Sequence, residues 1–106
     1  MARAVLSLPA KARHGEVIEI KTLIAHAMET GFRRTQLGEP IPRDIITRFV
    51  CTYNGDEIFR AELHPAIAAN PLLAFTTVAT ESGTLEFKWS GDRGFSLTES
   101  ATIAVE

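Results

Sequence analysis

The segment that decides the fold is Ile45–Leu63, IITRFVCTYNGDEIFRAEL, in which two alternating runs flank the pair Asn54-Gly55. In each run every second residue shares one face, as the period of two in a β-strand requires. The faces expected to point inward comprise Ile45, Thr47, Phe49, Cys51 and Tyr53 in the first run, and Phe59, Ala61 and Leu63 in the second. Asn and Gly both tolerate positive φ, so this pair between two such runs is the strongest short-range indication of a β-hairpin. The segment predicts two antiparallel strands joined by a tight turn.

Similar runs, separated by turn residues about every eight to twelve positions, lie on both sides of this hairpin. They predict strands at Ala4–Leu8, Glu16–Ala25, Leu72–Ala79, Thr84–Ser90 and Phe95–Val105. The clearest is TLEFKWS, 84–90, where Leu85, Phe87 and Trp89 alternate with charged residues. About seven strands and no amphipathic helix indicate an all-β fold, an immunoglobulin-like β-sandwich of about seven antiparallel strands. The length of 106 residues fits a single domain, residues 1–106.

The composition is that of an ordinary globular domain, with 45% hydrophobic and 23% charged residues and a net charge of −2. Such a balance creates no positive field for a phosphate backbone, and Arg33-Arg34 is the only adjacent basic pair, which argues against nucleic-acid binding. No apolar run approaches the ~20 residues needed to cross a membrane. Ala4–Leu8 is also too short for a signal peptide, so the residues alone favour a cytoplasmic protein.

One long segment, His26–Asp44, interrupts the strand pattern with the sequence HAMETGFRRTQLGEPIPRD. A connection of this length without a strand or helix period is uncommon in a compact domain and is usually functional where it occurs. It mixes apolar side chains such as Phe32 and Leu37 with arginines, a combination that suits a protein contact surface. The alternative is a long crossover with no role in binding.

The single cysteine, Cys51, is expected to be buried and inert. It lies in the middle of a predicted strand and shares a face with Phe49 and Tyr53, whereas a reactive cysteine needs exposure and a positive neighbour. One cysteine also excludes an internal disulfide.

The three histidines, His14, His26 and His64, lie at strand ends or in loops, and no two of them have the short spacing of metal ligands. A sandwich with His, Cys and Met resembles a blue-copper protein in composition, but nothing ligand-like follows Cys51 closely. No nucleotide-binding glycine motif is present either. The sequence therefore predicts no cofactor, no metal site and no catalytic residues. Two alternative hypotheses are a redox metal module that uses Cys51, His26 or Met28, and a stand-alone module that binds a small ligand.

Several segments resemble the SoxZ family of the bacterial sulfur-oxidation (Sox) system. They are HAMETG at His26–Gly31, IPRD at Ile41–Asp44, Arg48-Phe49, FRAELHPAIAANP at Phe59–Pro71, and the positions Glu81-Ser82-Gly83 and Phe87-Lys88-Trp89. The resemblance runs nearly from end to end. Family members commonly carry Pro after the first histidine, where this chain has Ala27.

The resemblance implies a function as well as a fold. SoxZ forms a heterodimer with SoxY, the SoxYZ carrier complex of thiosulfate oxidation. SoxY bears the sulfur substrate on a cysteine in a glycine-rich C-terminal arm, and other Sox enzymes contact the complex transiently. SoxZ would thus be a non-catalytic, periplasmic partner subunit, exported with SoxY, whose signal peptide serves both. The present chain ends in ATIAVE without such an arm, which agrees with the supporting role.

The resemblance and the long connection together predict which residues contact the partner. They are His26, Met28, Glu29, Thr30, Gly31, Arg33, Arg34 and Arg43 on the long connection, and His64, Pro65 and Asn70 on the connection that follows the hairpin. The competing interpretation is structural, with Thr30-Gly31 as a turn and Asn70-Pro71 as a bend between sheets.

Overall fold

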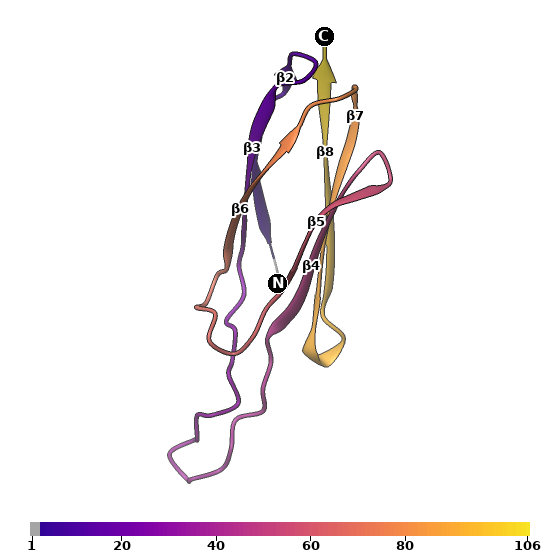
Figure 1. Cartoon of the computed structure of the whole chain (residues 1–106). Coiled ribbons are helices and arrows are strands. Elements are labelled where there is room, and N and C mark those ends of the chain that lie inside the picture. The colour runs from indigo at the N-terminus through magenta and orange to yellow at the C-terminus, as the bar shows by residue number, and fades with distance from the viewer. Residues whose placement is uncertain (1–2) are drawn as a thin grey trace.

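Two β-sheets pack face to face in the computed structural model, which describes residues 3–106 (Figure 1). The larger sheet has the strand order β2-β8-β7-β4-β5 and the smaller has the order β1-β3-β6. The strands of the larger sheet are β2 (Lys11–Ala12), β8 (Ser96–Val105), β7 (Gly83–Gly91), β4 (Ile46–Tyr53) and β5 (Asp56–Glu62). Those of the smaller sheet are β1 (Ala4–Ser7), β3 (Val17–Ile24) and β6 (Leu72–Val78). The predicted all-β, immunoglobulin-like sandwich is confirmed.

The core lies between the two sheets and is aromatic at its centre. Trp89, Phe49 and Phe87 are fully buried, and the Phe49 ring contacts the Trp89 ring with their centroids 5.1 Å apart. In β3 the alternation is complete, with every second side chain buried from Ile18 to Ile24. The period-2 pattern of the sequence therefore predicted correctly which faces of the central strands point inward.

The hairpin of β4 and β5 forms at the predicted turn. Asn54 and Gly55 have φ values of 49° and 88°, as the predicted tight turn requires. The prediction for the start of β4 was wrong in one detail: Thr47 does not point into the core. A β-bulge between Ile46 and Arg48 shifts the pairing with β7, so that Ile46 is buried instead and the Thr47 hydroxyl donates to the Ser90 carbonyl.

The described residues form eight strands, in line with the expected number of about seven. The short strand that the sequence did not indicate is β2, which forms beside the end of β8 where the chain leaves the smaller sheet after Pro9. This pair is parallel, whereas the other pairs of named strands are antiparallel. Proline has no N–H to continue the ladder of β1, which explains why β1 ends before it.

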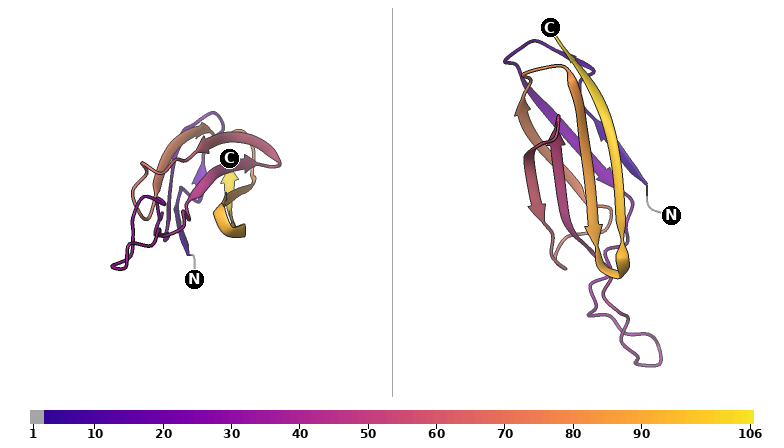
Figure 2. Two further views of the ribbon diagram at one scale, coloured as in Figure 1. Left: turned by 90° about the horizontal axis from the view of Figure 1, so that it is seen from below. Right: turned by 90° about the vertical axis from the view of Figure 1, so that its right-hand side faces the viewer.

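The molecule is elongated, 60 Å long and about 20 Å across. Part of that length comes from the long connection between β3 and β4, which projects beyond one end of the sandwich (Figure 2). The β7–β8 turn, with the 3₁₀ turn η1 (Asp92–Gly94), lies at the same end (Figure 1). Within residues 3–106 the structure contains no helix with the length and apolar character to span a bilayer.

Candidate partner-contact surface

The connection between β3 and β4 is an irregular hairpin, which we call the finger (residues 26–44). Two backbone hydrogen bonds join Glu29 and Asp44 in both directions, at 2.9 and 2.8 Å. Further out, the Ile41 N–H donates to the Arg33 carbonyl at 3.0 Å. The sequence predicted a connection without a regular period, and the finger has isolated bridges in place of a strand ladder.

Met28 fixes the base of the finger to the sandwich. Its side chain is buried, with 4% exposed, and its sulfur accepts the N–H of Ile46 at 3.3 Å. The backbone of Met28 has φ = 53°, a left-handed conformation that a methionine adopts only where its surroundings enforce it. Met28 was predicted to contact a partner, but burial leaves it almost no surface for one, so here its role is structural.

His26 joins the finger to two other loops. Its Nδ1 accepts the Met28 N–H at 2.9 Å, and its ring packs edge-on against Phe95, with the centroids 5.0 Å apart. Its backbone exchanges two hydrogen bonds with Asn70, one to the Asn70 side-chain oxygen at 3.0 Å and one from the Asn70 N–H at 2.7 Å. His26 and Asn70, both predicted as contact residues, are thus adjacent. Their hydrogen bonds also connect the finger to the segment between β5 and β6.

Arg43 ties the finger to the β7–β8 turn. Its guanidinium donates two hydrogen bonds to the carboxylate of Asp92, at 2.8 and 2.9 Å, and the same carboxylate accepts the Ile45 N–H at 3.2 Å. The pKa of Asp92 is lowered, first by the bond from Arg43 and then by that from the Ile45 N–H. Gly31 packs against this corner with φ = 88°, and a Cβ added there would lie 2.9 Å from the Arg43 Cβ.

A second ion pair lies within the finger, between Glu29 and Arg33. The guanidinium of Arg33 donates from both Nε and Nη2 to the Glu29 carboxylate. This bond lowers the pKa of Glu29 and raises that of Arg33. Next to it, the Thr30 hydroxyl accepts the Phe32 N–H at 3.1 Å, so Thr30-Gly31 is a turn as the competing interpretation held.

At the tip of the finger, residues 32–38, apolar side chains are exposed to solvent. Phe32 is 81% exposed and Leu37 is 87% exposed, the two highest values among the large hydrophobic residues. Beside them the guanidinium of Arg34 donates to the Gly38 carbonyl at 2.9 Å, and none of the carboxylates described pairs with it. Aromatic and aliphatic groups next to arginine are typical of protein interfaces. Sequence analysis noted Phe32 and Leu37 in this segment but did not include them among the contact residues.

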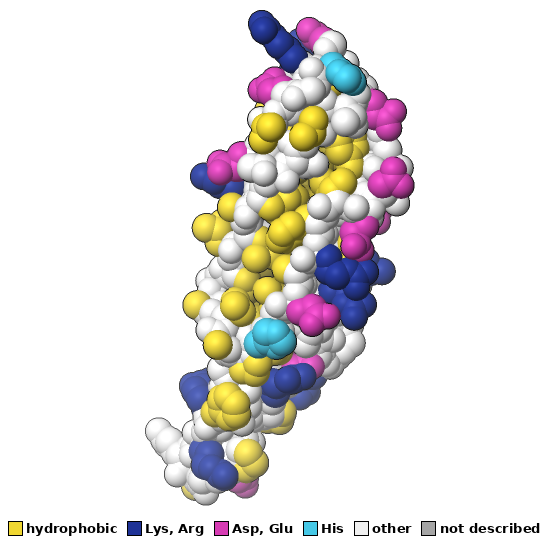
Figure 3. Space-filling model, in the orientation of Figure 1, with side chains coloured by type: hydrophobic (Ala, Val, Ile, Leu, Met, Phe, Trp, Pro, Cys, Tyr) yellow, Lys and Arg dark blue, Asp and Glu magenta, His cyan; other side chains and the backbone are white. Residues whose placement is uncertain are grey.

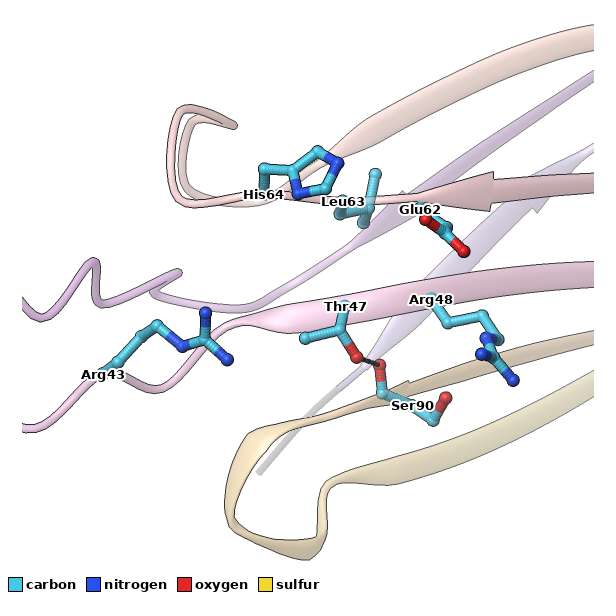
Figure 4. A pocket seen from close by; sticks show the side chains of 7 residues that line it. All are labelled: Arg43, Thr47, Arg48, Glu62, Leu63, His64 and Ser90. Carbon is cyan, nitrogen blue, oxygen red and sulfur yellow. Dashed lines mark hydrogen bonds between the residues drawn. The ribbon is translucent and has the colours of Figure 1, made fainter.

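A shallow depression of about 330 Å³ lies where the finger meets β4 (Figure 4). It is lined by Arg43, Thr47, Arg48, Glu62, Leu63, His64 and Ser90. Of the predicted residues, it brings His64 and Arg43 to one surface, and exposed His64 lies across from Thr47 (Figure 4). The lining is largely polar, unlike the mostly apolar walls of small-molecule sites, so it does not support a stand-alone ligand-binding module.

Cys51 is fully buried between the sheets, as predicted. Burial raises the pKa of its thiol to about 12, so the thiol stays protonated and unreactive near neutral pH. Cys51 also lies five residues along β4 from Ile46, about 16 Å at the usual rise of a strand. Because Met28 Sδ contacts the N–H of Ile46, the sulfurs of Cys51 and Met28 are too far apart to share a metal ion.

A metal-binding group of three or more His, Cys, Asp or Glu side chains is absent from the part of the chain that the structure describes. The redox metal module that the sequence left open therefore gains no support from this geometry. The Nδ1 of His26 already accepts a backbone hydrogen bond, and its Nε2 lies 4.0 Å from a carboxylate oxygen of Asp44.

The predicted contact residues therefore divide by position. Those that attach the finger to the sandwich are His26, Met28, Arg43 and Asn70. Glu29, Gly31 and Arg33 make contacts within the finger, and those with side chains or backbone on the surface include Thr30, Arg33, Arg34, His64 and Pro65. Sequence analysis did not identify Asp92, which lies between the strands predicted at Thr84–Ser90 and Phe95–Val105. Its partner Arg43 is 49 residues away, so no local pattern could have indicated it.

Comparison with known proteins gives one family and one fold. The family model described as "Sulphur oxidation protein SoxZ" matches residues 6–102, nearly the whole chain. No curated protein sequence matches.

Solved structures with the same fold are known. The superoxide reductase (neelaredoxin) from Ignicoccus hospitalis aligns with a TM-score of 0.73 and 15% identity, over 97% of this chain and 80% of that one. A putative superoxide reductase from Thermotoga maritima aligns with a TM-score of 0.70 and 18% identity, over 97% and 85%. A CARDB domain from Pyrococcus furiosus, solved in complex with di-metal ions, aligns with a TM-score of 0.57 and 12% identity, over 100% and 88%. At these identities the likeness shows the fold alone.

Proposed function

The chain belongs to the SoxZ family of sulfur-oxidation proteins, and on that premise we propose that it is a non-catalytic subunit that binds and supports SoxY. In this proposal SoxY carries the covalently bound sulfur substrate in thiosulfate oxidation, and the present chain holds SoxY in place for the other Sox enzymes. The proposal concerns the partner and the division of labour between the two chains.

The observation that carries the division of labour is the burial of Cys51. A sulfur carrier needs a thiolate on a mobile, exposed segment, because the thiolate is the nucleophile. Cys51 is 0% exposed, burial raises its pKa to about 12, and it lies in the middle of β4. The one thiol of this chain is not placed to present a substrate to an enzyme, which supports a division of labour in which another polypeptide carries the substrate.

The surface supports the role of a binding subunit. The tip of the finger exposes Phe32 and Leu37, and the smaller sheet exposes Val5, Leu23 and Leu72 on its outer face. Val5, Leu23 and Leu72 lie opposite one another in neighbouring strands, and adjoining exposed apolar groups mark interaction surfaces more often than scattered ones do. As part of the same proposal, the pair acts in the periplasm and the present chain is exported together with SoxY.

Co-expression of this chain with a SoxY partner tests the proposal directly. We expect a stable heterodimer in size-exclusion chromatography at micromolar concentration, with about 1,200–2,000 Å² of total buried surface as in standard interfaces. After turnover with thiosulfate, the other Sox enzymes and an acceptor for the two electrons released when thiosulfate is joined to a thiol, mass spectrometry is expected to find the sulfur adduct on SoxY and Cys51 unmodified. Independent elution of the two chains would contradict the partner role, and an adduct on native Cys51 would contradict the division of labour.

A further inference from the structure

The open side of the sandwich, between β6 and β5, contains a surface built to accept another β-strand. We infer that a strand of SoxY pairs with the outer edge of β6 and covers the apolar seam beside it. This inference rests on the proposed function and assigns the partner to one face of the molecule. We call this surface, Leu72–Val78 together with Ile58, Phe59 and Ala61, the β6 seam.

The backbone of β6 has one row of groups without a partner among the described residues. The N–H of Ile24 donates to Pro71 and the N–H of Ala79 donates to Glu16, which sets the phase of the β3–β6 ladder. Since hydrogen-bonded positions alternate in an antiparallel pair, the peptide groups of Leu72, Ala74, Thr76 and Val78 point away from β3. None of the strands in residues 3–106 lies on that side, because β6 is the last strand of the smaller sheet.

The side chains of β6 do nothing to prevent pairing. Its sequence, LLAFTTV, contains no charge, no proline and no glycine, and is rich in residues that favour strands. Natural proteins usually protect an edge of this length with charges, proline or a bulge, because an unprotected edge pairs with other chains.

The opposite edge of the same opening is protected in those ways. β5 carries Asp56, Glu57, Arg60 and Glu62, and its pairing with β4 is interrupted by a bulge after Cys51. The two edges therefore differ in their ability to bind a strand, and β6 is the one left open.

An apolar seam lies between the two edges. Phe59 of β5 and Phe75 of β6 stack across the gap with their ring centroids 4.3 Å apart and their planes within 2°. At one end of the seam, a groove of about 390 Å³ is lined by Ile58 and Val78 together with Thr77 and Thr80. Figure 3 shows the resulting band of hydrophobic side chains along this side of the molecule. A strand added to β6 would place its inward side chains over this band.

The surface also indicates what kind of strand binds. The strand that pairs with the β6 edge should be an extended, uncharged segment with apolar residues at alternate positions. The rim on the β5 side has three carboxylates against one arginine, and Glu81 lies at the end of the groove. Basic residues flanking the incoming strand would complement this rim. A second copy of this chain would instead bring the same acidic rim against its own, so the strand is assigned to the heterologous partner.

Amide hydrogen exchange of the chain alone and in complex with SoxY tests the inference without any mutation. The amides of Ala74 and Thr76 face the open edge, so they should exchange quickly in the free chain and slow at least about tenfold in the complex. The outward amides of β5, such as that of Arg60, serve as the internal control and should not change.

A pair of proline variants provides the second measurement. Ala74→Pro removes an outward N–H and leaves the β3 ladder intact, because that N–H does not take part in it. Arg60→Pro is the matched control on β5, where the bond from Leu63 N–H to Thr47 sets the phase and makes the Arg60 N–H face outward as well. We expect Ala74→Pro to weaken the complex about tenfold or more, through one lost hydrogen bond and an unsatisfied partner carbonyl, and Arg60→Pro to change it little.

The outcomes separate this inference from the proposed function. If wild-type chain binds SoxY but the β6 amides stay unprotected and Ala74→Pro binds normally, the seam is not the interface and the partner role stands. If the β6 amides become protected in the chain alone as its concentration rises, a second copy occupies the seam and the inference is wrong. If the wild-type chain forms no complex with SoxY, the proposed function is wrong, and the inference that rests on it is wrong with it. Circular dichroism and thermal melting of both proline variants establish that each is folded.

Discussion

The base and the tip of the finger contain the same kinds of residues, but these residues contact the sandwich at the base and are exposed to solvent at the tip. At the base, Met28 is 4% exposed and bonded to β4, whereas at the tip Leu37 is 87% exposed and Phe32 is 81% exposed. Arginines divide in the same way: Arg43 at the base is held by Asp92, and Arg34 near the tip is paired with none of the carboxylates described. The base of the finger is therefore attached to the sandwich, and the apolar tip is exposed to solvent.

This difference teaches that residue type alone does not identify a contact surface. Apolar and arginine side chains are frequent in interfaces, but they are also what a loop without regular structure needs to attach itself to a core. Contacts at the base should contribute more to the stability of the fold than contacts at the tip do. The predictions below test that difference in stability, beginning with the largest expected effect.

Met28→Ala should destabilise the protein by about 2–4 kcal/mol, because it removes a buried side chain and leaves the Ile46 N–H without its acceptor. The matched change at the tip, Phe32→Ala, removes a larger side chain but should change stability by less than about 0.5 kcal/mol, since that side chain is in solvent. Urea unfolding followed by tryptophan fluorescence measures both, through the buried Trp89. Equal losses for the two variants would abolish the distinction between base and tip.

Much of the fold could be predicted because local rules determine it. The alternation in TLEFKWS placed Leu85, Phe87 and Trp89 in the core, and Asn54-Gly55 supplied a turn that few other residue pairs could form. The bulge at Ile46 could not be predicted in the same way. It depends on which residues of β7 lie opposite, and a period of two cannot show a residue that has been inserted into the pairing.

The candidate site was harder to predict than the fold. Met28 gave no periodic pattern to mark it as buried, and its left-handed backbone is imposed by contacts with residues 18 positions away. The tie between Arg43 and Asp92 spans 49 positions, and the open edge of β6 depends on which strand ends the sheet. These features follow from topology, which a single sequence specifies only indirectly.

Gly31→Ala should cost more stability than Gly38→Ala, although both glycines have left-handed φ values of 88° and 82°. At Gly38 an added Cβ meets nothing within 4 Å, so the cost is that of the backbone conformation, about 1–2 kcal/mol. At Gly31 the Cβ would also lie 2.9 Å from the Arg43 Cβ, which adds about 1 kcal/mol of steric strain at the base. Thermal unfolding of the two variants measures the difference. A cost at Gly38 that equals that at Gly31 would mean that the base packs no more tightly than the tip.

The smallest expected effect is a pH dependence at the base. Arg43 and the Ile45 N–H lower the pKa of Asp92 below its value in the unfolded chain, about 3.9. A carboxyl whose pKa is lowered by folding stabilises the folded state above the unfolded pKa, and this contribution is lost as the pH falls through the folded pKa. We therefore expect Asp92→Asn to lower the melting temperature slightly at pH 7, and the gap from wild type to close as the pH drops below about 4.

Glu57→Gln is the control for that measurement, because the Glu57–Arg60 pair lies on the exposed edge of β5 and surface pairs contribute little. Exchange of the Ile45 amide gives the local result, since it should quicken in Asp92→Asn at neutral pH and not in Glu57→Gln. If the gap between Asp92→Asn and wild type stayed constant from pH 7 to pH 2, the charge of Asp92 would not hold the base. The base would then be held by Met28 and the Glu29–Asp44 bridge alone, and the ion pair at Arg43 would belong with the solvent-exposed charges of the tip.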